Sequence, residues 1–185
     1  VIEDDQLIDD LENEIGEHYI ELLALFQPMA KDLRFLATAM SFTTELERIA
    51  DLTVNISQRV TEIAAQGQGH IRPLVDTPRL AEAAKWMVKN AVNAFVRADE
   101  RLAREVIIKD QEANHLRTVI IGELVNDYLV KDGTCAPRAV PLILVVRDLE
   151  RICDQAKAIA QDVIYMVHAR VVKHHPERLQ DEGLE

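Results

Sequence analysis

Apolar residues recur along most of this chain at intervals of three and four positions, which is the period of an amphipathic helix with one buried face. Proline and glycine interrupt this pattern between the apolar stretches. The pattern predicts five helices, over about residues 1–26, 28–65, 77–98, 99–131 and 137–172. Aromatic residues make up only 4% of the chain, and with six Gly and six Pro this composition also favours an all-α fold.

Two of the predicted helix starts carry capping residues. Thr77 precedes Pro78, and a threonine cap followed by proline at the first helical position is typical of a helix start. Asp99 is placed to cap the next helix through its side-chain oxygen. The polar tail over residues 174–185 lies beyond the last predicted helix and is expected to fray.

A sixteen-residue signature occurs twice in the chain. Residues 45–60 read ELERIADLTVNISQRV and residues 148–163 read DLERICDQAKAIAQDV, with eight identical positions and an offset of 103 residues. Each copy carries a Glu and an Asp four residues apart, namely Glu47 with Asp51 and Glu150 with Asp154. On a helix, this spacing places both carboxylates on one face, one turn apart. Two such pairs of carboxylates at related positions predict two related binding sites.

The repeat divides the chain into two related halves. The second half, residues 77–173, contains three predicted helices, whereas the first half, residues 1–70, contains two. Long helices with short turns pack as antiparallel bundles, so we expect tandem antiparallel three-helix bundles with a pseudo-two-fold repeat. The chain opens inside a helical pattern, and the first helix of the first bundle is expected to be absent from it. The apolar faces of the first two helices should then be covered by a second copy of the chain, or the first bundle should be loosened.

The paired acids continue stripes that should turn toward the interior. The stripe of Glu47 and Asp51 is otherwise apolar, and so is that of Glu150 and Asp154 in the last helix. The apolar members are Leu33, Leu36 and Met40 in the first case and Ala139, Ile143 and Val146 in the second. Burying neighbouring like charges without compensation is costly. We therefore expect a cation beside each pair.

The helix before each signature supplies further oxygen donors at a spacing of four residues. The first candidate set is Asp5, Asp9, Glu47 and Asp51, and the second is Asp110, Asn114, Glu150 and Asp154. Carboxylate clusters without His or Cys suit hard or intermediate cations such as iron, manganese, magnesium or calcium, and zinc is compatible with them. Several acids around one point indicate more than one ion. Asn114 removes one charge from the second set, which predicts a weaker second site.

Two other interpretations stay open at this point. A solvated acidic face, with Arg48 and Arg151 neutralising their neighbours, would need no metal, and the chain would then be a metal-free helical scaffold. A carboxylate-bridged metal enzyme would need an open coordination position in a pocket. The sequence contains no glycine-rich phosphate loop, nucleophile elbow or Cys/His pairing, so it predicts no catalytic residue.

Net charge narrows the possible partners, and cysteine content narrows the cellular compartment. The net charge is −11, and the first thirty residues hold nine acids and no Lys or Arg. This charge argues against nucleic acid as a partner, because neutralising phosphates needs a basic surface.

No apolar run is long enough to span a membrane, and no signal peptide is visible. Two cysteines are too few for a disulfide framework, which favours a reducing compartment, and Cys153 at the repeat position of Ala50 reads as a packing residue.

The doubled signature resembles the PhoU family of bacterial phosphate-uptake regulators. The resemblance lies in Gln27-Pro28 followed by Asp32-Leu33-Arg34, in LERIAD over residues 46–51 and in LERICD over residues 149–154. It also includes Asp5 and Asp110 upstream of the two signatures and extends over essentially the whole chain. The family often has Gly where Ala50 and Cys153 stand, and an acid where Asn114 stands.

The resemblance implies a fold, a cofactor and partners. PhoU proteins are tandem three-helix bundles whose Glu/Asp pairs bind multinuclear clusters of iron or zinc, which would involve the eight residues of the two candidate sets. The family is cytoplasmic and non-enzymatic, and it often forms homodimers. It represses the phosphate-starvation response by linking the ATPase subunit of a phosphate ABC transporter to a sensor histidine kinase, and it meets the membrane only through these partners. We therefore expect a metal-binding signalling adaptor that acts on phosphate uptake.

Overall fold

The computed structural model describes residues 5–65 and 76–169, apart from the side chain of Asp5. Its elements are helices throughout: α1 (Asp5–Phe26), α2 (Ala30–Ala65), α3 (Asp76–Arg97), α4 (Glu100–Glu123), the π-helical turn η1 (Leu124–Leu129), the 3-10 turn η2 (Gly133–Cys135) and α5 (Ala136–His168). The predicted all-α fold is confirmed, since the described residues contain no strand. The predicted tail over residues 174–185 lies outside the described residues.

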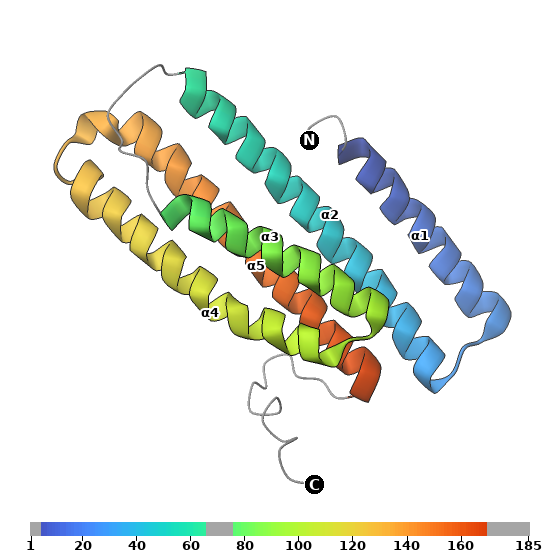
Figure 1. Cartoon of the computed structure of the whole chain (residues 1–185). Helices are drawn as coiled ribbons and strands as arrows, with labels where there is room; N and C mark the ends of the chain where they lie inside the picture. Colours follow the sequence, from blue (N-terminus) through green and yellow to red (C-terminus); the bar gives the residue numbers. More distant parts are fainter. Residues whose placement is uncertain (1–4, 66–75, 170–185) are drawn as a thin grey trace, which may run out of the picture.

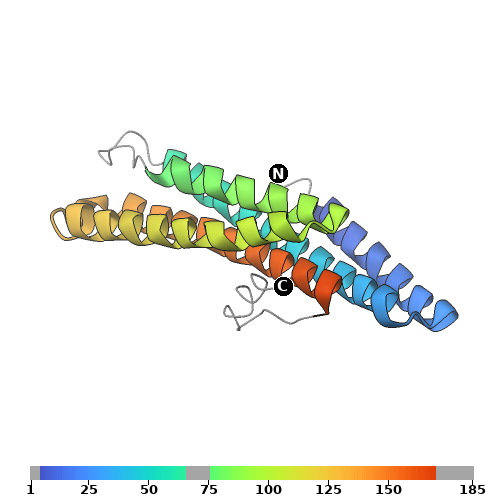
Figure 2. The same ribbon diagram turned by 60° about the horizontal axis from the view of Figure 1, so that its bottom comes forward.

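Two long helices, α2 and α5, run antiparallel at the centre of the molecule (Figure 1). Their opposite directions show in their contacts, because Ser41 near the start of α2 bonds Asp162 near the end of α5, while Arg59 near the end of α2 pairs with Asp148. Helices α3 and α4 pack on α5 and on each other, which completes a three-helix bundle, whereas α1 packs on α2 (Figure 2). No helix in the described ranges combines the length and the apolarity needed to cross a bilayer.

The two halves differ in how well they bury their apolar residues. In the second half, large side chains from all three helices are fully buried, among them Leu80, Met87, Val106, Ile120 and Val163. Helix α1 has no buried residue among those whose burial is described, and Leu7, Ile20 and Leu25 are more than half exposed. The expectation of partly uncovered apolar faces on the first two helices is therefore confirmed.

Two apolar cavities border the uncovered side of α2. One, of about 520 Å³, lies between α1 and α2 and is lined by residues such as Ile8, Leu11 and Leu46. The other, of about 1200 Å³, lies between α2 and α3, and residues of α4 and α5 also line it. Ile49 and Thr53 line both cavities, so the apolar surface continues from one to the other along α2.

Local signals predicted the helix ends with mixed success. Asp99 caps α4 as predicted, because its Oδ1 accepts a hydrogen bond from the backbone N–H of Leu102 at 3.0 Å. Thr77 is not the cap of α3, since the helix begins at Asp76 and the buried Oγ1 of Thr77 makes no hydrogen bond. The helix predicted over residues 99–131 changes to π-helical bonding at Leu124. The last helix ends at His168, where Ala169 takes the left-handed conformation with φ 57°.

Candidate metal-binding clusters

The first carboxylate cluster forms where α1 packs on α2. Helix α1 contributes Asp9 and Glu12, which lie close enough to Glu47 of α2 to act on it electrostatically. Burial raises the pKa of Glu47, and the charges of Asp51, Glu12 and Asp9 raise it further. Every charged group that shifts this pKa is therefore another carboxylate, and the cluster concentrates negative charge. Asp9 therefore lies within electrostatic reach of Glu47, and the side chain of Asp5 lies outside the described residues.

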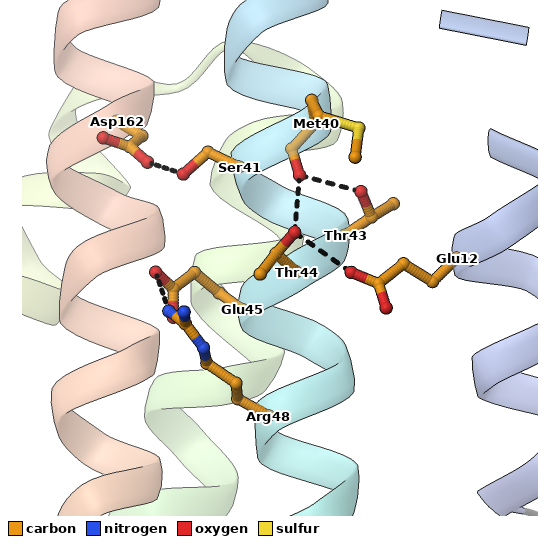
Figure 3. Close-up of polar contacts among 8 residues, drawn as sticks. All are labelled: Glu12, Met40, Ser41, Thr43, Thr44, Glu45, Arg48 and Asp162. Carbon is orange, nitrogen blue, oxygen red and sulfur yellow. Dashed lines mark hydrogen bonds and ion pairs between the residues drawn. The ribbon is translucent and has the colours of Figure 1, made fainter. Parts of the chain in front are cut away.

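A hydroxyl and an arginine define the surroundings of this cluster (Figure 3). Thr44 donates a hydrogen bond to Oε1 of Glu12 at 3.0 Å, which holds that side chain against α2. Arg48 points to the other side of the helix, where its Nη1 lies 3.2 Å from Oε1 of Glu45. The ion pair of Arg48 is therefore with Glu45, and the structure shows no ion pair by which Arg48 would neutralise Glu47 or Asp51.

The second carboxylate cluster forms where α4 packs on α5. Asp110 of α4 is buried, and its Oδ2 accepts hydrogen bonds from Nδ2 of Asn114 at 3.0 Å and from Nζ of Lys157 at 2.6 Å. Its other oxygen, Oδ1, is buried without a hydrogen-bond partner. On α5, Glu150 lies 3.4 Å from Nε of Arg117, which α4 supplies. The predicted grouping of Asp110 and Asn114 with the signature acids is observed, and two basic residues join them.

Both signature acids of the second cluster have raised pKa values. For Glu150, burial raises the pKa most and Asp154 adds to it, while Arg117 opposes the shift. For Asp154, burial and the charge of Asp110 raise the pKa, and Lys157 and Arg117 oppose them. The cluster therefore mixes repulsion among acids with attraction to bases, unlike the cluster on α1 and α2.

The expectation that the paired acids would turn fully inward is only partly correct. In both signatures the glutamate is half-buried, whereas Asp51 and Asp154 are exposed at the edge of the helix contact. The apolar stripe that precedes the first pair is also partly open, since Leu33 is 43% exposed. Helix α1 packs on α2 without burying any of its own described side chains, so this contact leaves α2 partly open. In the second bundle, Ala139 and Val146 of the corresponding stripe are buried as predicted.

Three charged residues of the clusters were not among the predicted site residues. Glu12, Arg117 and Lys157 each follow a predicted site residue by three positions, so they share its helix face. The i+3 neighbours of Asp9, Asn114 and Asp154 were therefore the signal that could have found them. In the part of the chain that the structure describes, no group of three or more His, Cys, Asp or Glu side chains is arranged to hold a metal ion.

The sequence matches a known domain family twice. The PhoU domain matches residues 1–60 and residues 77–163, which correspond to the two halves of the repeat. The phosphate-specific transport system accessory protein PhoU homolog of Pseudomonas putida is 33% identical over 174 residues, which cover 94% of this chain and 67% of that protein. The homolog of the same name from Aquifex aeolicus is 34% identical over 183 residues, which cover 99% of this chain and 80% of that protein.

Solved structures agree with this match. The crystal structure of PhoU from Pseudomonas aeruginosa superimposes with a TM-score of 0.87 at 32% identity, over 91% of this chain and 79% of that one. The phosphate transport system regulatory protein PhoU from Streptococcus pneumoniae superimposes with a TM-score of 0.82 over 93% of this chain and 79% of that one. Its 23% identity supports a shared fold.

Proposed function

Because this chain belongs to the PhoU family, we propose that it is a non-enzymatic, cytoplasmic regulator of phosphate uptake and of phosphate-starvation signalling. The observation that supports this proposal most is the extent of the match, which includes both halves of the repeat and 94–99% of the chain in relatives named as accessory proteins of a phosphate-specific transport system. In this role, the chain contacts the ATPase subunit of a phosphate ABC transporter and a sensor histidine kinase. The helical surface provides docking faces for both proteins.

Metal binding belongs to the same proposal, and the donor set on α1 and α2 suits it. Asp9, Glu12, Glu47 and Asp51 all carry oxygen donors, and the pKa of Glu47 is raised by burial and then by the charges of the other three carboxylates. Iron, zinc or another divalent cation held by these residues would neutralise the cluster and join α1 to α2. The side chains would have to converge from their present arrangement to bind it. The ion's role is structural or conformational.

Exposed apolar residues on α1 support self-association. Leu7, Leu25 and Phe26 are 61%, 67% and 72% exposed, and such surfaces on a helical protein are commonly buried between subunits. A second copy of the chain would cover them in a homodimer. Light scattering during size-exclusion chromatography measures the mass of the assembly, and a monomer at micromolar concentration would contradict this part of the proposal.

A genetic test addresses the regulatory function directly. The chain is expressed in a bacterium from which its own PhoU protein has been deleted, together with a reporter for the phosphate-starvation response. We expect the reporter to be repressed again in phosphate-rich medium. A reporter that stays active while the chain accumulates as folded protein would contradict the proposal. Pull-down with the transporter ATPase subunit and the sensor kinase then identifies the contact that fails.

Two further measurements separate the alternative functions. Elemental analysis of the protein as isolated distinguishes a metal-binding adaptor from a metal-free helical scaffold. Assays for phosphoester hydrolysis and for oxygen consumption test the carboxylate-bridged metal enzyme, which needs an open metal position beside a substrate pocket. Turnover by the metal-loaded protein that disappears in an E47Q/D51N variant would contradict the non-enzymatic role.

A further inference from the structure

The two carboxylate clusters differ in charge at positions that the repeat relates. The offset of 103 residues that aligns the two signatures pairs Val54 with Lys157. The offset of 105 residues that aligns Asp5 with Asp110 pairs Glu12 with Arg117. An uncharged residue and an acid in the first half therefore correspond to two bases in the second half.

These substitutions change the contacts of the signature glutamates. In the first half, Glu12 adds repulsion to Glu47, and its charge helps to raise the pKa of that residue. In the second half, the corresponding pair is Arg117 and Glu150, whose side chains form an ion pair at 3.4 Å. The same position on the preceding helix therefore repels the signature acid in one cluster and attracts it in the other.

Lys157 makes the second difference at the centre of its cluster. Its ammonium lies 2.6 Å from Oδ2 of Asp110, and it also opposes the rise in the pKa of Asp154. A lysine ammonium so placed contributes the positive charge that a cation would otherwise supply between these carboxylates. Val54 at the corresponding position of α2 has no charge to contribute.

The clusters also differ in their ion pairs. The second cluster opposes Asp110 with Lys157 at 2.6 Å and Glu150 with Arg117 at 3.4 Å. The first cluster presents four described carboxylates, and no described Lys, Arg or His forms an ion pair with them.

We infer that the cluster on α4 and α5 holds no metal ion, because Lys157 and Arg117 already pair with its carboxylates. The repeat has therefore diverged into one cation-dependent cluster on α1 and α2 and one internally ion-paired cluster. A divalent ion at Asp110 would have to displace the ammonium of Lys157 or lie beside it, and the repulsion between the two cations opposes both arrangements. Only the assignment of metal to the first cluster rests on the proposed function.

Ion counts in site-directed variants test the inference. The full chain is dialysed separately against Mn²⁺, Zn²⁺ and, without oxygen, Fe²⁺, and the bound ions per chain are measured by elemental analysis. We expect the D110N/D154N variant to bind as many ions as the wild-type chain and the E47Q/D51N variant to lose them. A lower count in the folded D110N/D154N variant would overturn the inference.

The converse experiment replaces two bases of the second cluster with the residue types found at the corresponding positions of the first half. The R117E/K157V variant should gain at least one bound ion per chain, and adding D110N/D154N should remove that gain. The matched control R101E/K85V changes the same charges at two exposed residues, whose side chains are 91% and 73% accessible, and it should gain none. A folded R117E/K157V protein without extra metal would overturn the inference. If this variant does not fold, K157Q alone provides the same comparison.

The two experiments also separate this inference from the proposed function. A wild-type chain that binds none of the three metals contradicts the proposed site on α1 and α2. A gain of metal by R117E/K157V would still support the internally ion-paired second cluster in that case. Loss of metal on D110N/D154N substitution contradicts the inference and leaves metal binding by the chain intact.

Discussion

The ammonium of Lys157 lies 2.6 Å from Oδ2 of Asp110, and this ion pair joins α5 to α4 inside the second carboxylate cluster. The side chain of Asp110 is 4% exposed, whereas that of Lys157 is 33% exposed. Burial removes the water that would otherwise solvate the aspartate, so this carboxylate depends on Lys157 and Asn114 for its stabilisation.

Replacing Lys157 with methionine should destabilise the protein in the absence of metal. The buried charge of Asp110 would lose its ionic partner, and we expect a cost of about 2 kcal/mol, below the ~3–5 kcal/mol of a fully buried pair, because water reaches Lys157. Urea denaturation in the presence of a chelator measures this cost. The control Lys85→Met breaks an exposed pair with Glu82 and should cost under about 1 kcal/mol. Equal effects of the two substitutions would contradict the prediction.

Replacing Glu47 with glutamine should stabilise the metal-free protein. Glu47 faces only carboxylates among the charged groups that shift its pKa, so removing its charge relieves repulsion by about a few tenths of a kcal/mol. In saturating Zn²⁺ or Mn²⁺ the sign should reverse, because the variant loses a ligand. Thermal denaturation with and without metal shows both effects. Glu62→Gln, at an exposed position of the same helix, should show neither. A loss of stability without metal would argue against an uncompensated cluster.

The ion pair between Arg59 and Asp148 should contribute strongly to the contact of α2 with α5. Both side chains are largely buried, at 24% and 7% exposure. Asp148→Ala should destabilise the protein by about 2–3 kcal/mol, since it leaves a poorly solvated guanidinium without its partner. The double substitution R59M/D148L should recover much of this loss, because two apolar side chains need no charge compensation. Urea midpoints that are lower for the double variant than for Asp148→Ala would contradict this account.

The two cysteines should differ in reactivity toward thiol reagents. Cys153 is fully buried, and burial, followed by the charges of Asp110 and Asp154, raises the pKa of its thiol to about 12. Because the thiolate is the reactive form, Cys153 should not react at pH 8 in the folded protein. Cys135 is partly exposed and should react. Titration with Ellman's reagent, with and without guanidinium, counts the reactive thiols, and rapid reaction of both in the folded state would contradict the prediction.

The contact between Glu100 at the start of α4 and His168 at the end of α5 should make the stability of the protein sensitive to acid. Burial raises the pKa of Glu100, but hydrogen bonds from His168 and Arg104 outweigh this effect and lower the pKa overall. A carboxyl whose pKa is lowered by folding stabilises the fold above its unfolded pKa of ~4.3, and this stabilisation is lost as pH falls through the folded pKa. Glu100→Gln should therefore cost about 0.5–1 kcal/mol at pH 7, and this cost should disappear as the pH falls through the folded pKa of Glu100. A cost independent of pH in chemical denaturation would exclude this linkage.

Local sequence signals predicted most of the secondary structure. Apolar periodicity depends on residues three and four apart, so it located all the long helices, and Asp99 marked the start of α4 through a hydrogen bond within three residues. Thr77 failed as a cap because the helix begins one residue earlier, at Asp76. The π-helical turn at Leu124–Leu129 was not predicted, since its hydrogen-bond shift leaves the apolar pattern nearly unchanged.

The sequence by itself determined the helices, the repeat and the positions of the paired acids, because these depend on spacing along one helix. Tertiary structure decided which charges meet across helices. Glu12 reaches Glu47 only because α1 packs on α2, and Arg117 reaches Glu150 only because α4 packs on α5. Spacing along α5 places Lys157 beside Asp154, but its contact with Asp110, 47 residues away, arises from packing. The repeat in the sequence therefore predicts two equivalent clusters, and the packing of neighbouring helices makes them electrostatically different.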